Sequence, residues 1–360
     1  MRPIGERRIA VLAEDGFDLL EAKTAVGVIR YGRDPVVAVV DSRYTGRTAS
    51  DIVGVGDDVP IVESVAAALA YKPNTLLLGT APRGGVLPAA WRQQVVHAMR
   101  EGLDVINGLH HFLEEDEELA GVARSCGVDL WDVRRVPDEH RVADTRAHQL
   151  DATIVLTVGS DCNVGKMSAS LELDTAARRA GHRSAFVATG QTGIIIAGWG
   201  VAIDRVISDF AAGASEDLVM QGAEQGDIVF VEGQGSLVHP GYSGVTLSLI
   251  HGSAPDGMIL CHQVTRTTIR RYTLPVPPLR DLVTLHEHAT AHVKPSRVIG
   301  IALNTFGLDE AAAQQAIAAA ADETGLPATD PVRYDVQPLL APVEALHNRR
   351  KQEREKAAGG

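Results

Sequence analysis

The segment Thr153–Ser168, TIVLTVGSDCNVGKMS, constrains the fold of this chain more than any other. An apolar, β-branched run ends at a glycine, and a short polar loop then leads through Gly165 and Lys166 into a helix-like segment. Glycines let such a loop curl until its backbone N–H groups converge on an anion. The helix adds the positive end of its dipole, and the lysine adds a charge for the outer phosphate oxygens. This order predicts a P-loop in a parallel α/β sheet, rather than only a glycine-rich turn.

Two departures from the usual P-loop pattern limit the chemistry of this loop. Five residues, not four, separate the two glycines, a spacing found in P-loop proteins resembling dethiobiotin synthetase. Met167 takes the place of the Ser or Thr whose hydroxyl usually ligates Mg²⁺ in phosphoryl transfer. Ser168 comes one residue late, which turns its side chain by about 100° on a helix. We therefore expect phosphate binding without a metal, at Gly159, Ser160, Asp161, Cys162, Asn163, Val164, Gly165, Lys166, Met167 and Ser168.

Short apolar runs alternate with helix-like segments along the whole chain, which is typical of doubly wound parallel sheets. The predicted strands are 9–13, 35–40, 75–78, 103–106, 153–158, 184–188, 227–231, 257–261 and 297–302. The predicted helices are 21–31, 63–71, 89–101, 115–125, 166–180, 217–225, 279–293 and 310–324. A polar, proline-containing stretch separates the two sets. We expect one α/β domain over 1–135, a linker over 136–150, a second domain over 151–347 and a flexible tail over 348–360.

The net charge and the cysteine content indicate which partners and which cellular compartment to expect. The chain has 34 Lys and Arg against 46 Asp and Glu, a net charge of −12. Nucleic acid and anionic membranes would repel such a protein, so we expect neither as a partner. The three cysteines Cys126, Cys162 and Cys261 fit neither a disulfide framework nor a zinc motif, which indicates a reducing compartment. The chain begins without a signal-like apolar run and has no stretch of about 20 apolar residues. We expect a cytoplasmic protein and, from its exposed loop faces, a homo-oligomer.

A second group of polar residues follows the predicted strand 227–231, in the sequence DIVFVEGQGSLVHP. In P-loop folds the acid at the end of such a strand faces the phosphate loop. Glu232 and His239 are both candidate proton acceptors, because both side chain types can titrate near neutrality when shifted. Ser236 lies between them as a candidate donor. A capped turn without function is the alternative.

A third group follows the predicted strand 184–188, where Gln191 and Thr192 should reach the same edge of the sheet as the P-loop. Turn capping explains these two residues equally well. Weaker features remain open. A solvated helix face explains His288 and His292 better than a metal site does, and Cys162 is interpreted as a small filler rather than a nucleophile. The basic residues Arg266, Arg270 and Arg271 are typical either of an anion clamp or of an exposed surface.

Taken together, the runs GSDCNVGKMS, GQTGIIIAGWGVAID, VEGQGSLVHPGYSGVTLSLIHGS and NGLHHFL resemble a bacterial family long described as a domain of unknown function. The resemblance covers roughly residues 5–345. It implies a Rossmann-like N-terminal domain followed by a P-loop NTPase-like domain. The family includes D-glutamate N-acetyltransferases that use acetyl-CoA, so the resemblance implies a transferase acting on an amino acid.

The resemblance also implies roles for the candidate residues. The loop Gly159–Ser168 would bind the phosphates of CoA, and His239 or Glu232 would be the general base for the substrate amine. Oxyanion donors would be Gln191, Thr192 or Ser236, and the carboxylate clamps would be Arg83 and Arg266. No metal is expected. The rival hypothesis is a Mg²⁺-dependent ATPase or ligase of the dethiobiotin synthetase type, which would need Ser168 or Asp161 in its metal shell. A nucleotide-binding regulatory protein without turnover is a third class.

Overall fold

The computed structural model describes residues 1–18, 21–80, 87–138 and 141–358. The chain divides into two compact units, Met1–Val136 with Gln191–Ala202 and Pro137–Gly190 with Ile203–Gly360. Each unit is built on one six-stranded sheet, and the paired strands of both sheets are parallel. The predicted fold class, two parallel-sheet α/β domains, is confirmed.

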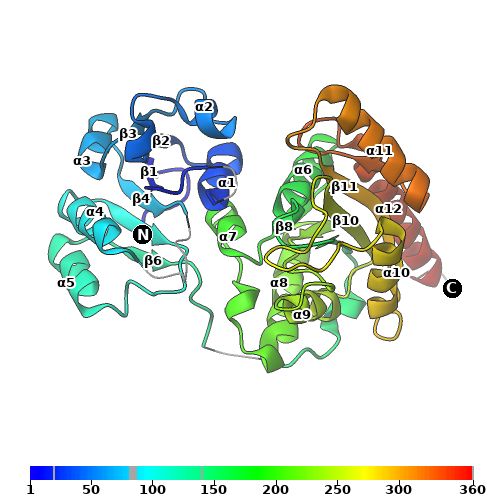
Figure 1. Cartoon of the computed structure of the whole chain (residues 1–360). Helices are drawn as coiled ribbons and strands as arrows, with labels where there is room; N and C mark the ends of the chain where they lie inside the picture. The colour runs from blue at the N-terminus through cyan, green and yellow to red at the C-terminus, as the bar shows by residue number, and fades with distance from the viewer. Residues whose placement is uncertain (19–20, 81–86, 139–140, 359–360) are drawn as a thin grey trace. The chain divides into compact units, whose positions relative to one another are not determined.

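The N-terminal unit has the strand order β3-β2-β1-β4-β5-β6. Its strands are β1 Ile9–Leu12, β2 Val36–Val40, β3 Ile61–Val62, β4 Thr75–Leu78, β5 Asp104–Asn107 and β6 Leu130–Asp132. Its helices are α1 Lys23–Tyr31, α2 Ala49–Val53, α3 Val65–Ala68, α4 Ala89–Arg100, α5 Glu117–Cys126 and α7 Gln191–Ala197. Helix α7 packs against α1, while α4 packs against both α3 and α5 (Figure 1). The two groups cover opposite faces of the sheet, because the strand order reverses after β3.

The second unit has the strand order β12-β11-β10-β7-β9-β8. Its strands are β7 Thr153–Gly159, β8 Ser184–Val187, β9 Ile228–Val231, β10 Gly257–Gln263, β11 Arg297–Asn304 and β12 Ala328–Thr329. Its helices are α6 Lys166–Arg179, α8 Ser208–Gln225, α9 Ser243–Ser253, α10 Leu279–Thr290, α11 Glu310–Thr324 and α12 Gln337–Ala358. Helix α6 packs against α12, and α8, α9, α10 and α11 form a second contiguous layer (Figure 1). The carboxyl ends of β9, β7 and β10 are therefore neighbours at one sheet edge.

The apolar runs in the sequence form the centres of both sheets. Every residue of β1, β4, β5, β7 and β9 is buried, which is the pattern of strands covered by helices on both faces. Burying one Val, Leu or Ile side chain stabilises the folded state by about 1.5–3 kcal/mol. The long uninterrupted runs thus account for both the position and the burial of these strands.

The end of the chain, where a flexible tail is predicted over 348–360, is helical as far as the structure describes it. Helix α12 continues to Ala358. Arg350 pairs with Asp256 through its Nη1 and donates from Nη2 to the Leu150 carbonyl oxygen at 3.0 Å. Arg350 thus anchors this part of α12 to a buried acid, whereas residues 351–356 are mostly exposed, as their charged side chains predict. No helix in the described part of the chain is both long and apolar enough to cross a membrane.

His286 in helix α10 gives the fold a defined sensitivity to acid. The side chain is fully buried, and its Nδ1 donates to the Leu282 carbonyl oxygen at 2.7 Å. Its Nε2 has no hydrogen-bond partner among the described residues. Burial lowers the pKa of this imidazole to about 4 from its usual value of 6.5. The unfolded chain therefore binds a proton between these pH values that the folded protein does not bind.

We expect the free energy of unfolding to fall as the pH falls through this window, by about 3 kcal/mol from this histidine alone. Above about pH 6.5 the histidine is neutral in both the folded and the unfolded chain, so it no longer lowers the free energy of unfolding. The variant His286→Leu should lose that part of the pH dependence, whatever its stability at neutral pH. Urea unfolding of both proteins at about pH 7.5 and about pH 5, either side of the usual histidine pKa, measures the difference. Equal pH dependence in both would contradict the assignment.

Candidate functional site

The loop between β7 and α6 has the backbone conformation of an anion cradle. Asn163 and Gly165 have positive φ angles of 54° and 109°, so the chain curls sharply there. Helix α6 begins at Lys166, directly after this curl. Its first N–H groups lack intrahelical partners and carry the positive end of the helix dipole. The predicted P-loop geometry is therefore present in the backbone.

The side chain of Lys166 folds back into the loop. It is 6% exposed, and its Nζ donates to the Asp161 carbonyl oxygen at 2.8 Å. A Cβ at Gly159 would lie 2.9 Å from this Nζ, and a Cβ at Gly233 would lie 1.6 Å from the Thr157 carbonyl oxygen. Gly233 is thus required by the neighbouring backbone, whereas at Gly159 a side chain would displace the lysine ammonium. The arrangement keeps a positive charge inside the loop at the position where a phosphate would bind.

The carboxylate of Asp161 holds the loop in place. This residue is fully buried, and its Oδ1 accepts from the Cys162 N–H at 2.7 Å. Its Oδ2 accepts from Nη1 of Arg266 at 2.8 Å and from the backbone N–H of Arg270 at 2.6 Å. Nη2 of Arg266 donates to Oε1 of Gln263 at 2.8 Å. The Asp161 carboxylate therefore ties the loop to Arg266 and to the backbone at Arg270. A substrate carboxylate bound by Arg266 would share the guanidinium with Asp161.

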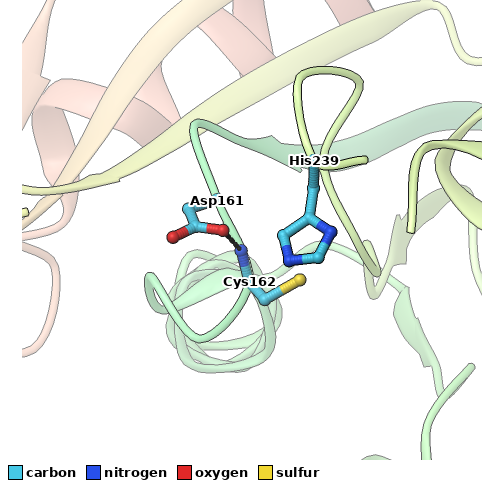
Figure 2. A group of neighbouring side chains, drawn as sticks. All are labelled: Asp161, Cys162 and His239. Atoms are coloured by element: carbon cyan, nitrogen blue, oxygen red, sulfur yellow. Dashed lines mark hydrogen bonds between the residues drawn. The ribbon is translucent and has the colours of Figure 1, made fainter. Parts of the chain in front are cut away.

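His239 faces the loop, with its imidazole pointing toward Cys162 (Figure 2). The ring stacks on Tyr242 at 4.5 Å between centroids and meets the edge of Tyr272 at 5.2 Å. Its Nδ1 accepts a hydrogen bond from the Gly241 N–H at 3.1 Å. A neutral ring whose Nδ1 is an acceptor carries its proton on Nε2, the nitrogen on the Cys162 side. The geometry thus presents a hydrogen-bond donor, not a proton acceptor, toward the loop.

Asp161, Cys162 and His239 also form a group of potential metal ligands, with one ligand atom from each lying within 4.8 Å of the others. Their hydrogen bonds argue against a resident ion. Both carboxylate oxygens of Asp161 already accept hydrogen bonds from N–H groups. The Gly241 N–H keeps the proton of the neutral His239 ring on Nε2, where a metal would have to bind. The donor set therefore does not fit a metal without rearrangement.

Glu232 lies at the carboxyl end of β9 and is 3% exposed. Its Oε2 accepts from the backbone N–H groups of Thr189 and Gly190 at 3.0 and 3.1 Å. Its carbonyl oxygen accepts from the Thr189 hydroxyl at 2.6 Å, and Nε2 of Gln234 donates to the Thr189 carbonyl oxygen. The carboxylate therefore holds the segment that follows β8, besides being a candidate base.

The other predicted residues fall in three different settings. Ser236 is fully buried, and its carbonyl oxygen accepts from the His239 N–H at 3.0 Å, so it shapes the turn that carries His239. Gln191 and Thr192 begin α7, which belongs to the N-terminal unit rather than to the P-loop unit as their position after 184–188 predicted. There the Thr192 hydroxyl is 2.9 Å from the Thr24 hydroxyl. Arg83 lies outside the described residues.

Several residues near the loop were not predicted. Oγ of Ser160 lies 2.9 Å from Nδ1 of His262 on β10. Burial lowers the pKa of His262. Tyr242 and Tyr272, which contact His239, were also not predicted as site residues. Their positions in the sequence could have indicated them, because they lie on or after β9 and β10, the two strands next to β7 in the sheet.

The pair of the buried Asp161 and the partly buried Arg266 yields a stability prediction. Asp161→Ala leaves Arg266 and two N–H groups without their acceptor, and breaking a buried pair from one side typically costs about 3–5 kcal/mol. We expect the free energy of unfolding to fall by about 3 kcal/mol. Asp322→Ala, on the exposed face of α11, is the matched control and should change it by less than about 0.5 kcal/mol. Equal small losses in urea unfolding of both variants would contradict the anchoring role.

Comparisons with known proteins place this fold in a family. Residues 141–340 match a domain of unknown function (DUF1611_C) described as a P-loop domain, and residues 42–136 match its Rossmann-like partner (DUF1611_N). A D-glutamate N-acetyltransferase from Tritonibacter scottomollicae is 37% identical, over 92% of this chain and 97% of the relative. One from Pseudoalteromonas sp is 35% identical, over 77% of this chain and 83% of the relative.

A comparison with solved structures indicates the same family. The crystal structure of a DUF1611 family protein from Anabaena variabilis superimposes with a TM-score of 0.91 at 43% identity, covering 94% of this chain and all of that chain. The chain therefore belongs to the DUF1611 family, in which a Rossmann-like domain precedes a P-loop domain and which includes relatives named D-glutamate N-acetyltransferase.

Proposed function

We propose that this protein transfers the acetyl group of acetyl-CoA to the amine of D-glutamate or a related amino acid. The names of two relatives support an N-acetyltransferase. The observation that carries the proposal is a P-loop whose lysine lies in place while Met167, 5% exposed, occupies the position of the Mg²⁺-binding hydroxyl. Such a loop suits a ligand whose phosphates are held but not transferred. In cells we expect a cytoplasmic homo-oligomer.

Acetyl-CoA offers the loop a pyrophosphate and a ribose phosphate. The backbone N–H groups of the loop and the N-terminus of α6 would bind one of these groups, with Lys166 as the charged partner. Binding of the phosphates fixes the position of the thioester without taking part in its chemistry. The remaining groups must then supply a proton acceptor for the amine and donors for the thioester oxygen and the leaving thiolate.

The hydrogen bonds of His239 and Glu232 indicate which residue is the donor and which is the proton acceptor. The Gly241 N–H occupies Nδ1 of His239, so the neutral ring offers its Nε2–H to an oxyanion or a thiolate. Glu232 is a carboxylate and can only accept while ionised. We therefore propose Glu232 as the proton acceptor and His239 as a donor, although the sequence left either residue as the base. The oxyanion roles of Gln191, Thr192 and Ser236 and the clamp roles of Arg83 and Arg266 stay predictions.

The rival function is a Mg²⁺-dependent ATPase or ligase resembling dethiobiotin synthetase. It would need Asp161 or Ser168 as a substitute metal ligand. Asp161 is already bonded to Arg266 and to two backbone N–H groups. Purified protein incubated with acetyl-CoA and a panel of D- and L-amino acids, monitored for free CoA thiol, tests the proposal. Phosphate release from ATP without thiol release would favour the rival.

Lys166→Ala tests the donor site. Charge-assisted hydrogen bonds contribute about 1.5–3 kcal/mol, so we expect acetyl-CoA to bind roughly 10–100-fold more weakly, with D-glutamate affinity much less affected. Lys351→Ala, at an exposed position of α12, removes the same charge outside the loop and should leave both affinities unchanged. Isothermal titration with each ligand measures the effect. An unchanged acetyl-CoA dissociation constant in Lys166→Ala would remove the loop from the donor site.

Chelation tests the role of metal. Thioester aminolysis has no intrinsic need for a metal, and Met167 offers no hydroxyl to Mg²⁺. We expect the rate of CoA thiol release to stay largely unchanged after EDTA treatment and removal of the chelator. Loss of this activity with recovery on adding Mg²⁺ would favour the ATPase-type function or a structural ion.

Paired substitutions test the assignment of acceptor and donor. Glu232→Gln keeps an oxygen for the Thr189 and Gly190 N–H groups but removes the basic carboxylate, so kcat should fall roughly 10²–10⁴-fold. The dissociation constant of acetyl-CoA should be unchanged. His239→Asn should lower kcat but keep the acidic limb of the pH–rate profile. If that limb disappears in His239→Asn and persists in Glu232→Gln, the histidine is the base and our assignment is wrong.

A further inference from the structure

A cavity lies within the N-terminal unit at the amino ends of its strands, and no P-loop residue lines it. Its volume is about 620 Å³, in the range of small-molecule sites. The cavity is lined by residues 1–4, by Arg7 and Arg33, which precede β1 and β2, by residues 129–131 and by the end of α7 at Ala197 and Gly198. Ligands in doubly wound sheets usually bind at the opposite, carboxyl edge, so the proposed transfer reaction gives this cavity no role.

Arg7 is the most unusual residue of this cavity. It is 6% exposed, and its guanidinium lies over the ring of Trp131, 5.1 Å from the centroid. Its Nε donates to the Arg2 carbonyl oxygen at 2.8 Å, whereas its Nη1 has no hydrogen-bond partner among the described residues. Burial lowers the pKa of Arg7, although the carboxylates of Asp34 and Asp104 oppose this effect. A buried guanidinium nitrogen without an acceptor is costly, and Arg7 is also one of the residues that line the cavity.

The surrounding charges leave this end of the unit attractive to anions. Arg33 lines the same cavity on an exposed position and forms no ion pair within the described part of the chain. Asp129, the one acid in the lining, pairs with the N-terminal ammonium of Met1. Arg2 pairs with Asp104 at 2.8 Å. With the buried carboxylate of Asp34 beside Arg7 included, these groups carry four positive and three negative charges, so the cavity keeps one net positive charge in a protein whose net charge is −12.

The rest of the lining is apolar. Pro3, Ile4, Leu130, Trp131 and Ala197 contribute to the walls. A ligand that only carried charge would not use these surfaces, whereas an organic anion would bury its carbon skeleton against them. Arginine forks bind carboxylates and phosphates alike. From these observations we propose that the cavity at Arg7 and Arg33 is a binding site for a small organic anion with an apolar part and a carboxylate or phosphate group.

The test uses the full chain in the Lys166→Ala background, so that binding at the P-loop does not contribute. Benzoate and phenyl phosphate are the two probes, and they distinguish a carboxylate ligand from a phosphate ligand. We expect saturable heat in isothermal titration with at least one of them. We also expect slower hydrogen exchange in residues 1–7 and 194–198 when that probe is bound, because both segments reach the cavity.

Arg33→Gln should weaken that binding about tenfold, as expected for one charge-assisted contact, and Arg7→Met should abolish it. Arg30→Gln removes the same charge from an exposed position of α1 outside the cavity and is the matched control. Because Arg7 is buried, thermal melting must first show that its variant is folded; if it is not, Arg33→Gln against Arg30→Gln decides. Absence of binding by both probes, or equal affinity in Arg33→Gln and Arg30→Gln, would overturn the proposal.

Discussion

The buried carboxylate of Asp161 is the interaction on which the phosphate loop depends. It joins the loop after β7 to the segment after β10 through Arg266 and the backbone N–H of Arg270. These partners meet because β7 and β10 are adjacent parallel strands, so their carboxyl ends share one sheet edge. The loop is therefore held in its curled form by the protein itself. A ligand that binds it does not have to order it, which preserves affinity.

The same principle explains the orientation of His239. Ser236 accepts from the His239 N–H, and the Gly241 N–H donates to Nδ1, so the turn fixes the ring and the position of its proton together. Thioester aminolysis passes through an oxyanion and expels a thiolate, and both species accept hydrogen bonds. A ring that offers Nε2–H suits those species better than it suits an ammonium group. This is the physical reason for separating the donor from the proton acceptor in the proposed mechanism.

Sequence alone could predict the longer strands and the loop, because both depend on local patterns, but the short strands β3, β6 and β12 were not predicted. The uninterrupted apolar runs at β7 and β9 specify strands buried on both faces, and the glycines with Lys166 specify the cradle. The partners of individual side chains could not be predicted in this way. Asp161 and Arg266 are 105 residues apart in the chain, and nothing in either local sequence indicates their contact.

Helix α7 shows the same limit on a larger scale. Its sequence follows β8 of the P-loop unit, yet α7 packs on α1 in the N-terminal unit. The predicted helices do not include 191–197, and periodicity does not indicate which element covers an apolar helix face.

The position of α7 also relates the two proposed binding sites through the chain itself. Glu232 holds Thr189 and Gly190, and the next residue begins this seven-residue helix. The helix ends at Ala197, in the wall of the cavity that contains Arg7.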